Sequence, residues 1–146
     1  MTADVDLSAY PASLNMWEFA GVLDGGGHTL SNTSVKGDGL FDAVLDGGVV
    51  KNLRVENVDV TGDAPGGIVG ELTGATLENC SFSGDVVRTE SQWESYMHAG
   101  GLVHTATDAV LSHCYNYGQP GGEFDMGSYA GVVYEAKNCT MTDLIN

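Results

Sequence analysis

Carboxylates are the most numerous groups in this sequence that could do chemistry. Asp24, Asp38, Asp42 and Asp46 cluster near the expected turns of the early coils, and Asp59 and Asp63 follow later. Carboxylates grouped on one face can cleave a glycosidic bond. Enzymes acting on acidic sugars usually also place Lys or Arg there, and the 5 basic residues of this chain do not recur at matching positions. Because turn aspartates more often accept hydrogen bonds from the local backbone, we expect no catalytic residues. A carbohydrate-active enzyme remnant stays the lesser alternative.

The 4 histidines and 3 cysteines do not form a recognisable metal-binding pattern. No His-Glu-x-x-His or Cys-x-x-Cys motif is present, so the specific zinc signals are missing. Cys80 and Cys114 occupy equivalent places in the repeat described below and are predicted to be reduced core thiols, although a disulfide lies within reach of two stacked coils. We expect no metal and no cofactor, with weak Ca²⁺ binding by turn carboxylates as the alternative.

The charge balance excludes several partners. Twenty acidic residues face 5 basic ones, for a formal charge of −15. Nucleic acids and anionic membranes require basic patches that this composition cannot supply, and no apolar run is long enough to insert into a membrane. The acidic excess suits solubility, cations, or a salty or extracellular setting. No signal peptide is visible at the start, so we expect any export signal to lie outside this chain.

Two short phrases repeat along the chain. The first occurs as Gly39-Leu40-Phe41, Gly67-Ile68-Val69, Gly101-Leu102-Val103 and Gly131-Val132-Val133. In the last three repeats, the first Gly precedes Cys80, Cys114 or Leu144 by 13 residues, without any gap. Apolar and polar residues alternate within each phrase, which indicates strands with one buried face. Repetition at a fixed phase is the signature of a stacked architecture.

The repeats predict an all-β fold, a right-handed parallel β-helix (β-solenoid) of about four to five coils. Stacked coils lie about 4.8 Å apart, so equivalent residues form ladders. The expected core ladders are Leu40/Ile68/Leu102/Val132, then Leu30/Val50/Leu77/Leu111/Met141, then Thr33/Leu53/Cys80/Cys114/Leu144. A ladder of amides is expected at Asn32, Asn52 and Asn79. Residues 1–146 are expected to form one domain, which can be a piece of a longer solenoid.

A family resemblance rests on residues 19–32, Gly39-Leu-Phe-Asp42, Gly48–Val58, Gly66–Gly70, Asn79-Cys80-Ser81 and Cys114-Tyr115-Asn116. In these segments the chain resembles the GLUG-motif family of bacterial repeats, over residues 4–146. The resemblance implies a non-catalytic part of a large secreted or cell-surface protein, such as an adhesin or an IgA-protease-like protein. The sequence departs from the family pattern at His104 and Tyr134, where the motif usually ends in Gly.

Two segments are longer than the repeat requires, and both follow the same strand of adjacent coils. They span residues 85–98 and 119–129 and should leave the solenoid on one side. Insertions on one face of a repeat stack are often its binding surface, and aromatic residues anchor many interfaces. Shielding of a coil edge is the alternative. The candidate binding residues are Trp93, Tyr96, His98, His104, Phe124, Tyr129 and Tyr134.

The sequence therefore predicts a bacterial extracellular or cell-surface module that serves as an adhesive surface or a structural stalk. A host protein or a glycan is the expected partner, with no nucleic acid and no membrane insertion. The alternative is a subunit that stacks end to end on other copies, because the outer coils of a solenoid have unpaired strand edges.

Overall fold

The structure is a computed structural model that describes residues 1–10, 13–89, 97–122 and 127–146. Its elements are strands, in the order β1 Val5–Asp6, β2 Met16–Phe19, β3 Val22–Asp24, β4 Thr29–Lys36, β5 Phe41–Leu45, β6 Val49–Lys51, β7 Arg54–Gly62, β8 Val69–Thr73, β9 Thr76–Glu78, β10 Ser81–Phe82, β11 Asp85–Arg88, β12 Met97–Gly100, β13 Val103–Thr107, β14 Val110–Asn116, β15 Gln119–Gly122, β16 Gly127–Ala130, β17 Val133–Lys137 and β18 Thr140–Ile145. Within these ranges no helix is long and apolar enough to cross a membrane.

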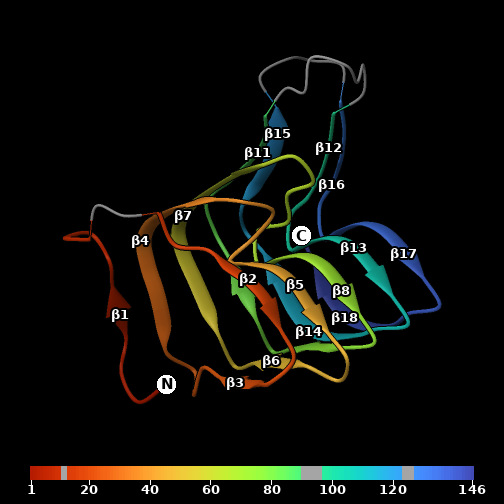
Figure 1. Ribbon diagram of the computed structural model, residues 1–146, viewed down its shortest axis with the longest axis horizontal. Coiled ribbons are helices and arrows are strands. Elements are labelled where there is room, and N and C mark those ends of the chain that lie inside the picture. Colours follow the sequence, from red (N-terminus) through yellow and green to blue (C-terminus); the bar gives the residue numbers. More distant parts are fainter. Residues whose placement is uncertain (11–12, 90–96, 123–126) are drawn as a thin grey trace.

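All strand pairs are parallel, and they join each coil to the next. One sheet has the order β17-β13-β8-β5-β2, so each of its strands comes from a successive coil. A larger sheet contains β1, β4, β7, β10 and β14 together with β9, β6 and β3, and β12 pairs with β16 in a third sheet. Figure 1 shows the five-stranded sheet stacked in the foreground, with the strands of the larger sheet beside and behind it. The predicted parallel β-solenoid is confirmed.

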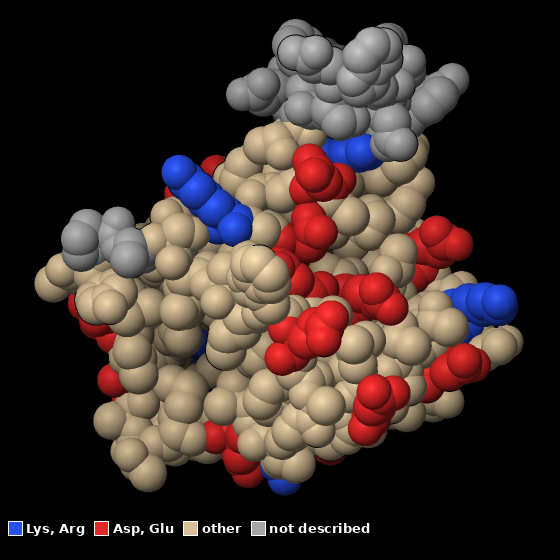
Figure 2. Space-filling view, in the orientation of Figure 1, with Lys and Arg blue, Asp and Glu red and all other residues tan. Residues whose placement is uncertain are grey.

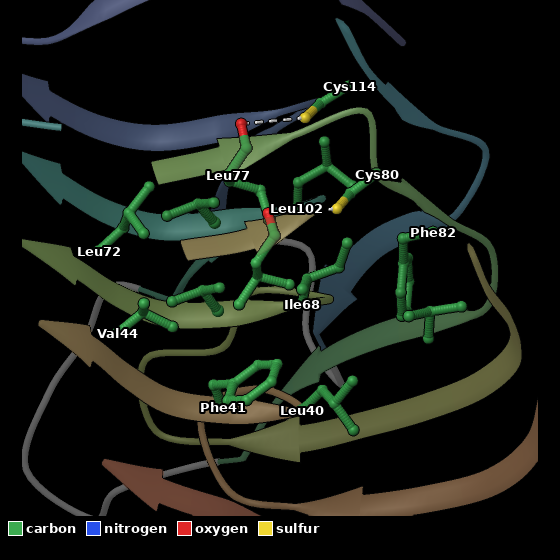
Figure 3. Packing of buried hydrophobic residues seen from close by; sticks show 14 of the residues in the cluster. Leu40, Phe41, Val44, Ile68, Leu72, Leu77, Cys80, Phe82, Leu102 and Cys114 are labelled. Carbon is green, nitrogen blue, oxygen red and sulfur yellow. Dashed lines mark hydrogen bonds between the residues drawn. The ribbon is translucent and has the colours of Figure 1, made fainter. Parts of the chain in front are cut away.

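The interior is a set of apolar ladders (Figure 3). Leu40, Ile68 and Leu102 are fully buried at equivalent positions, because the residues that follow them pair as Phe41↔Val69 and Val69↔Val103. Val132 continues this ladder, half-buried at the last coil. Such stacking of like side chains removes apolar surface from water along the whole stack of coils. The first predicted ladder is therefore confirmed.

The other two core ladders are confirmed from their second member onward and wrong at their first. Val50, Leu77, Leu111 and Met141 are in register, and so are Leu53, Cys80, Cys114 and Leu144. Leu30 instead pairs with Val55, and Thr33 with Val58. The pattern apolar-x-Asn-x occurs at residues 30–33 and again at residues 55–58. Both segments lie one corner later in their coils than Val50 and Leu53, so they pair with each other. Leu23 takes the place beside Val50.

The two stacked thiols are free and buried, as predicted. Burial raises the pKa of the Cys80 thiol to about 12 and also raises the pKa of the Cys114 thiol. The Cys80 Sγ lies 3.3 Å from the Glu78 carbonyl oxygen, and the Cys114 Sγ lies 3.2 Å from the Ser112 carbonyl oxygen. Both thiols therefore act as small core residues rather than as reactive groups.

Left-handed residues bend each coil at the same corner. Asn52, Asn79, His113 and Asp143 have φ of +54°, +50°, +52° and +52°. Asn and Asp tolerate this conformation better than most residues because their short polar side chains bond locally. Asn79 Nδ2 donates to Asn52 Oδ1 at 2.8 Å, and Asn52 Nδ2 donates to Asp24 Oδ1 at 3.0 Å. The corner thus carries a hydrogen-bonded ladder of side chains that ends on a carboxylate.

The predicted amide ladder is in fact two ladders. Asn52 and Asn79 share one, as expected, but Asn32 belongs to a second corner together with Asn57. Asn57 Nδ2 donates to Asn32 Oδ1 at 2.7 Å, and Asn32 Nδ2 donates to Asp6 Oδ1 at 3.0 Å. The amide of Asn32 is the main cause that lowers the pKa of Asp6, and the amide of Asn52 does the same for Asp24. The same register shift that moves Leu30 moves Asn32.

Glycine opens the first phrase because the backbones of adjacent coils approach closely there. A Cβ on Gly101 would lie 2.1 Å from the carbonyl oxygen of Gly131, and one on Gly67 would lie 2.4 Å from that of Gly101. Backbone atoms cannot move aside without breaking the parallel ladder, so no side chain fits at this position.

Gly101→Ala should lower the free energy of unfolding by about 1–3 kcal/mol, because the added methyl overlaps the next coil. The matched control is Gly121→Ala, where a Cβ meets nothing within 4 Å. Urea denaturation followed by circular dichroism measures both variants. Equal stabilities of the two variants would contradict the close approach.

Asn52→Ala should destabilise the fold more than Asn52→Gly does. Both variants lose the amide hydrogen bonds, but only Ala also carries the cost of a left-handed residue, about 1–2 kcal/mol. The difference between the two unfolding free energies in urea isolates this cost. If both variants lose the same stability, the corner conformation is not what selects Asn at this position.

Candidate binding groove

The outer face of the five-stranded sheet carries two adjacent rows of side chains. In the three middle strands, β5, β8 and β13, two residues lie between buried neighbours, as Asp42 and Ala43 do between the fully buried Phe41 and Val44. The outer rows run across β2, β5, β8, β13 and β17, and the register places Glu18, Ala43, Glu71, Thr105 and Glu135 in one of them. The preceding residues, Trp17, Asp42, Gly70, His104 and Tyr134, form the other. In β5, β8, β13 and β17, the residue in this second row is the one that directly follows the three-residue phrase that begins with Gly.

A groove of about 640 Å³ lies over the middle of these rows. Its lining residues are Trp17, Glu18, Asp38, Asp42, Ala43, Ala64, Gly70, Glu71, His104 and Thr105. Gly70 forms part of the floor, where a Cβ would lie 2.7 Å from the Cβ of Asp38. Because Gly70 has no side chain, its row is interrupted between Asp42 and His104. Figure 2 shows carboxylates gathered across this face of the molecule, with the basic groups toward its margins.

Two of the groove carboxylates hold the backbone in place. Asp42 Oδ1 accepts a hydrogen bond from the Asp38 backbone N–H at 2.8 Å and one from Asn15 Nδ2 at 3.2 Å. Asp38 Oδ1 accepts bonds from the backbone N–H groups of Asp63 and Ala64, at 2.9 and 2.8 Å. These two aspartates act as turn residues, which is the role that the sequence favours for them.

Trp17 is the most conspicuous side chain of the groove. It is 79% exposed, although the neighbouring Phe19 packs inward, with its ring centroid 5.2 Å from that of Phe41. Glu18 and Glu71 lie beside it as exposed carboxylates of the adjacent row. A flat aromatic surface next to hydrogen-bond acceptors is suited to binding a ligand.

Three of the predicted site residues form one aromatic stack. The ring of Tyr134 stacks with two imidazoles, with centroids 4.6 Å from His98 and 5.1 Å from His104 and interplanar angles of 20° and 15°. Burial lowers the pKa of His104, so its imidazole is neutral at physiological pH. His104 lines the groove, and His98 belongs to β12 in the first of the two long segments. The stack therefore links the groove to that segment.

The two long segments leave the solenoid together, as predicted. Strand β11 pairs with β15, and β12 pairs with β16, so the four strands form an arm (residues 85–88, 97–100, 119–122 and 127–130). Figure 1 shows this arm rising from the solenoid body. Tyr129 lies on β16 and is 36% exposed. The predicted site residues Trp93, Tyr96 and Phe124 lie outside the described residues.

Sequence reasoning missed Trp17, Glu18 and Glu71. Trp17 is equivalent to the residue that follows the Gly-initiated phrase in the other coils, and Glu18 and Glu71 are equivalent to the residue after that. The repeat therefore contained the information needed to find them. For Trp17 and Glu18 it was not recognised because β2 begins at Met16 and no Gly-initiated phrase precedes it. The alignment of Met16 with Phe41 becomes visible only in the sheet register.

A second, smaller depression of about 390 Å³ lies over the other sheet. Arg54, Tyr115 and Tyr117 line part of it, and the two tyrosine rings stack with centroids 6.5 Å apart. In the described part of the chain, no group of three or more His, Cys, Asp or Glu side chains is placed to hold a metal ion.

The comparisons with known proteins agree with the repeat pattern. The GLUG motif matches residues 61–87, which cover the end of β7, all of β8 to β10 and most of β11. Halomucin from Haloquadratum walsbyi (strain DSM 16790 / HBSQ001) is 34% identical over 93 residues, a match that spans 60% of this chain and 1% of halomucin. No solved structure matches the chain.

The lowered pKa of His104 makes stability depend on pH. Between this lowered pKa and the usual value of 6.5, the unfolded chain binds a proton that the folded chain excludes. Stability therefore falls as the pH drops below about 6.5. His104→Phe keeps a ring in the stack but cannot titrate, so its melting temperature should fall less than that of the wild type between pH 7.5 and 5.5. Parallel melting curves of both proteins would contradict this origin.

Proposed function

We propose that this chain, in which residues 61–87 match the GLUG motif, is a non-catalytic β-solenoid module of a secreted or cell-surface protein. In this proposal the module is adhesive and binds its partner through the groove and the adjoining arm. A purely structural stalk would need neither feature.

The exposure of Trp17 is the observation that carries the proposal. The Trp17 indole, which lines the groove, is 79% exposed and leaves a large apolar area in water. This exposure contributes nothing to the stability of a monomer, because apolar surface is stabilising only when it is buried. Tryptophan is also among the residues that contribute most when buried at an interface. Trp17 lies on a rigid strand, so binding would cost little additional order.

The chemistry of the groove supports binding rather than turnover. Asp38 and Asp42 are hydrogen-bonded to the backbone, and a general acid or a nucleophile needs a carboxyl group that is free to approach the substrate. The groove lining also contains no Lys or Arg that could bind an acidic sugar beside these carboxyl groups. Asp38 and Asp42 thus hold the turns, and the groove offers a ligand surface and the exposed carboxylates of Glu18 and Glu71.

The extracellular assignment has separate support. The matched segment is a very small part of halomucin, which fits a module within a much longer chain. The formal charge of −15 suits a surface exposed to high salt, because counterions screen the repulsion between carboxylates.

End-to-end association with other copies is a second candidate. Strands β17 and β18 each pair on one side, and Met141 and Ile145 on the last coil are 38% and 52% exposed. The same edge would equally accept a further coil of a longer chain. Analytical ultracentrifugation distinguishes the two cases, since association requires mass that increases with protein concentration.

Binding should depend on Trp17. On an array of glycans and surface proteins, Trp17→Ala should lose at least tenfold in affinity for any ligand that the wild type binds, as expected for an aromatic anchor worth about 1.4 kcal/mol or more. The matched control is Tyr117→Ala, which removes a ring that is 69% exposed over the other sheet. If Tyr117→Ala loses binding and Trp17→Ala does not, the binding site lies over the other sheet and the groove is not the site.

A further inference from the structure

The outer row that begins at Glu18 is spaced regularly in a way that limits its ligand. Exposed glutamates occupy every second coil, at Glu18, Glu71 and Glu135, and the small residues Ala43 and Thr105 lie between them. Because parallel strands are about 4.7–4.9 Å apart, consecutive glutamates are separated by about 9.4–9.8 Å along the stack. The row is therefore a line of negative charges with a constant period.

These carboxylates are available to a ligand. Within the described ranges, neither Glu18 nor Glu135 forms a side-chain hydrogen bond or ion pair, and Glu71 uses only Oε1, which accepts from Thr73 Oγ1 at 2.9 Å. The groove lining contains no Lys or Arg. The groove thus carries uncompensated negative charge, which favours a cationic ligand.

Aromatic rings lie beside both ends of this row. Trp17 precedes Glu18, and Tyr134 precedes Glu135. Aromatic faces bind proline rings and the cationic ends of Lys and Arg. Between the two rings the floor is low, because Gly70 has no side chain and Ala43 has a small one. A ligand lying along the stack would therefore contact the exposed ring of Trp17 at one end and carboxylates along its length.

We propose that this row binds an extended, proline-containing basic peptide segment of a partner protein, with a Lys or Arg at every third residue. A polyproline II helix repeats every three residues and advances about 9.3 Å per turn. This advance matches two coil spacings, so successive basic side chains meet Glu18, Glu71 and Glu135 in turn. The inference rests on the binding function proposed above and names its partner class.

The match in period supplies the specificity that single charges cannot. A surface ion pair contributes at most about 1 kcal/mol, and any polycation would gain from one such pair. When several pairs form at once without bending the peptide, the later contacts follow the first at high effective concentration. A peptide with its charges at another spacing can satisfy one glutamate and misses the others.

The test uses the whole chain and synthetic peptides. The probe is a fluorescent peptide of repeated Pro-Pro-Lys triplets, and the comparison peptide has the same composition with its lysines gathered at one end. Fluorescence anisotropy at about 0.15 M salt measures both affinities, since this ionic strength screens long-range attraction. The triplet peptide should bind at least tenfold more tightly than the comparison peptide.

Variants then assign this preference to the row. Glu71→Gln should weaken binding of the triplet peptide by about fivefold, and the triple variant Glu18→Gln, Glu71→Gln, Glu135→Gln should abolish the preference for triplet spacing. The matched control is Glu78→Gln, an exposed glutamate of β9 in the other sheet, which should bind as the wild type does. Circular dichroism confirms that all variants fold.

Three outcomes would overturn the inference. They are equal affinities for the two peptides, an equal loss in Glu78→Gln, and a neutral glycan that requires Trp17 but binds Glu71→Gln unchanged. The last outcome would leave the proposed binding function standing and would replace the partner. If no ligand on the array depends on Trp17 for binding, the proposed function itself is refuted.

Discussion

Every feature of this molecule depends on the parallel backbone hydrogen bonds between coils. These bonds hold equivalent residues of successive coils at one spacing, so each choice of side chain is multiplied into a ladder. The Leu40, Ile68 and Leu102 ladder fills the interior by this means, and the amides of Asn52 and Asn79 bond to each other by the same means. The glutamate row on the outer face has its period for the same reason.

The corners explain how a short repeat can specify so regular a coil. A left-handed residue at each level turns the strand without a long loop, and the amides of Asn52 and Asn79 bond to the level below. Each ladder ends on Asp24 or Asp6, whose carboxylates accept the last amide hydrogen bond. Local conformation and the contact between coils therefore favour the same residue, a consistency typical of sequences that fold to one state.

The fold could be predicted from the sequence because its signal is repeated, whereas the site could be predicted only in part. The phase between Gly101 and Cys114 recurs in the coils on either side, and this recurrence determines the stacking of the core. The first coil was misaligned since residues 30–33 resemble two different corners equally well. His104 and Tyr134 were found as departures from the pattern, and the structure stacks them together with His98. Trp17 was missed because no repeated phrase marks its strand.

The position that follows each Gly-apolar-apolar phrase has an evolutionary consequence. The residues before it are buried, but its own side chain lies on the outer face, where Asp42, Gly70, His104 and Tyr134 occupy it in turn. The close approach of Asp38 fixes Gly70, but a mutation at His104 or Tyr134 changes the surface of one coil and leaves the core of every coil intact. Duplication of a coil followed by substitution at this single position would therefore diversify recognition stepwise, with each intermediate still able to fold.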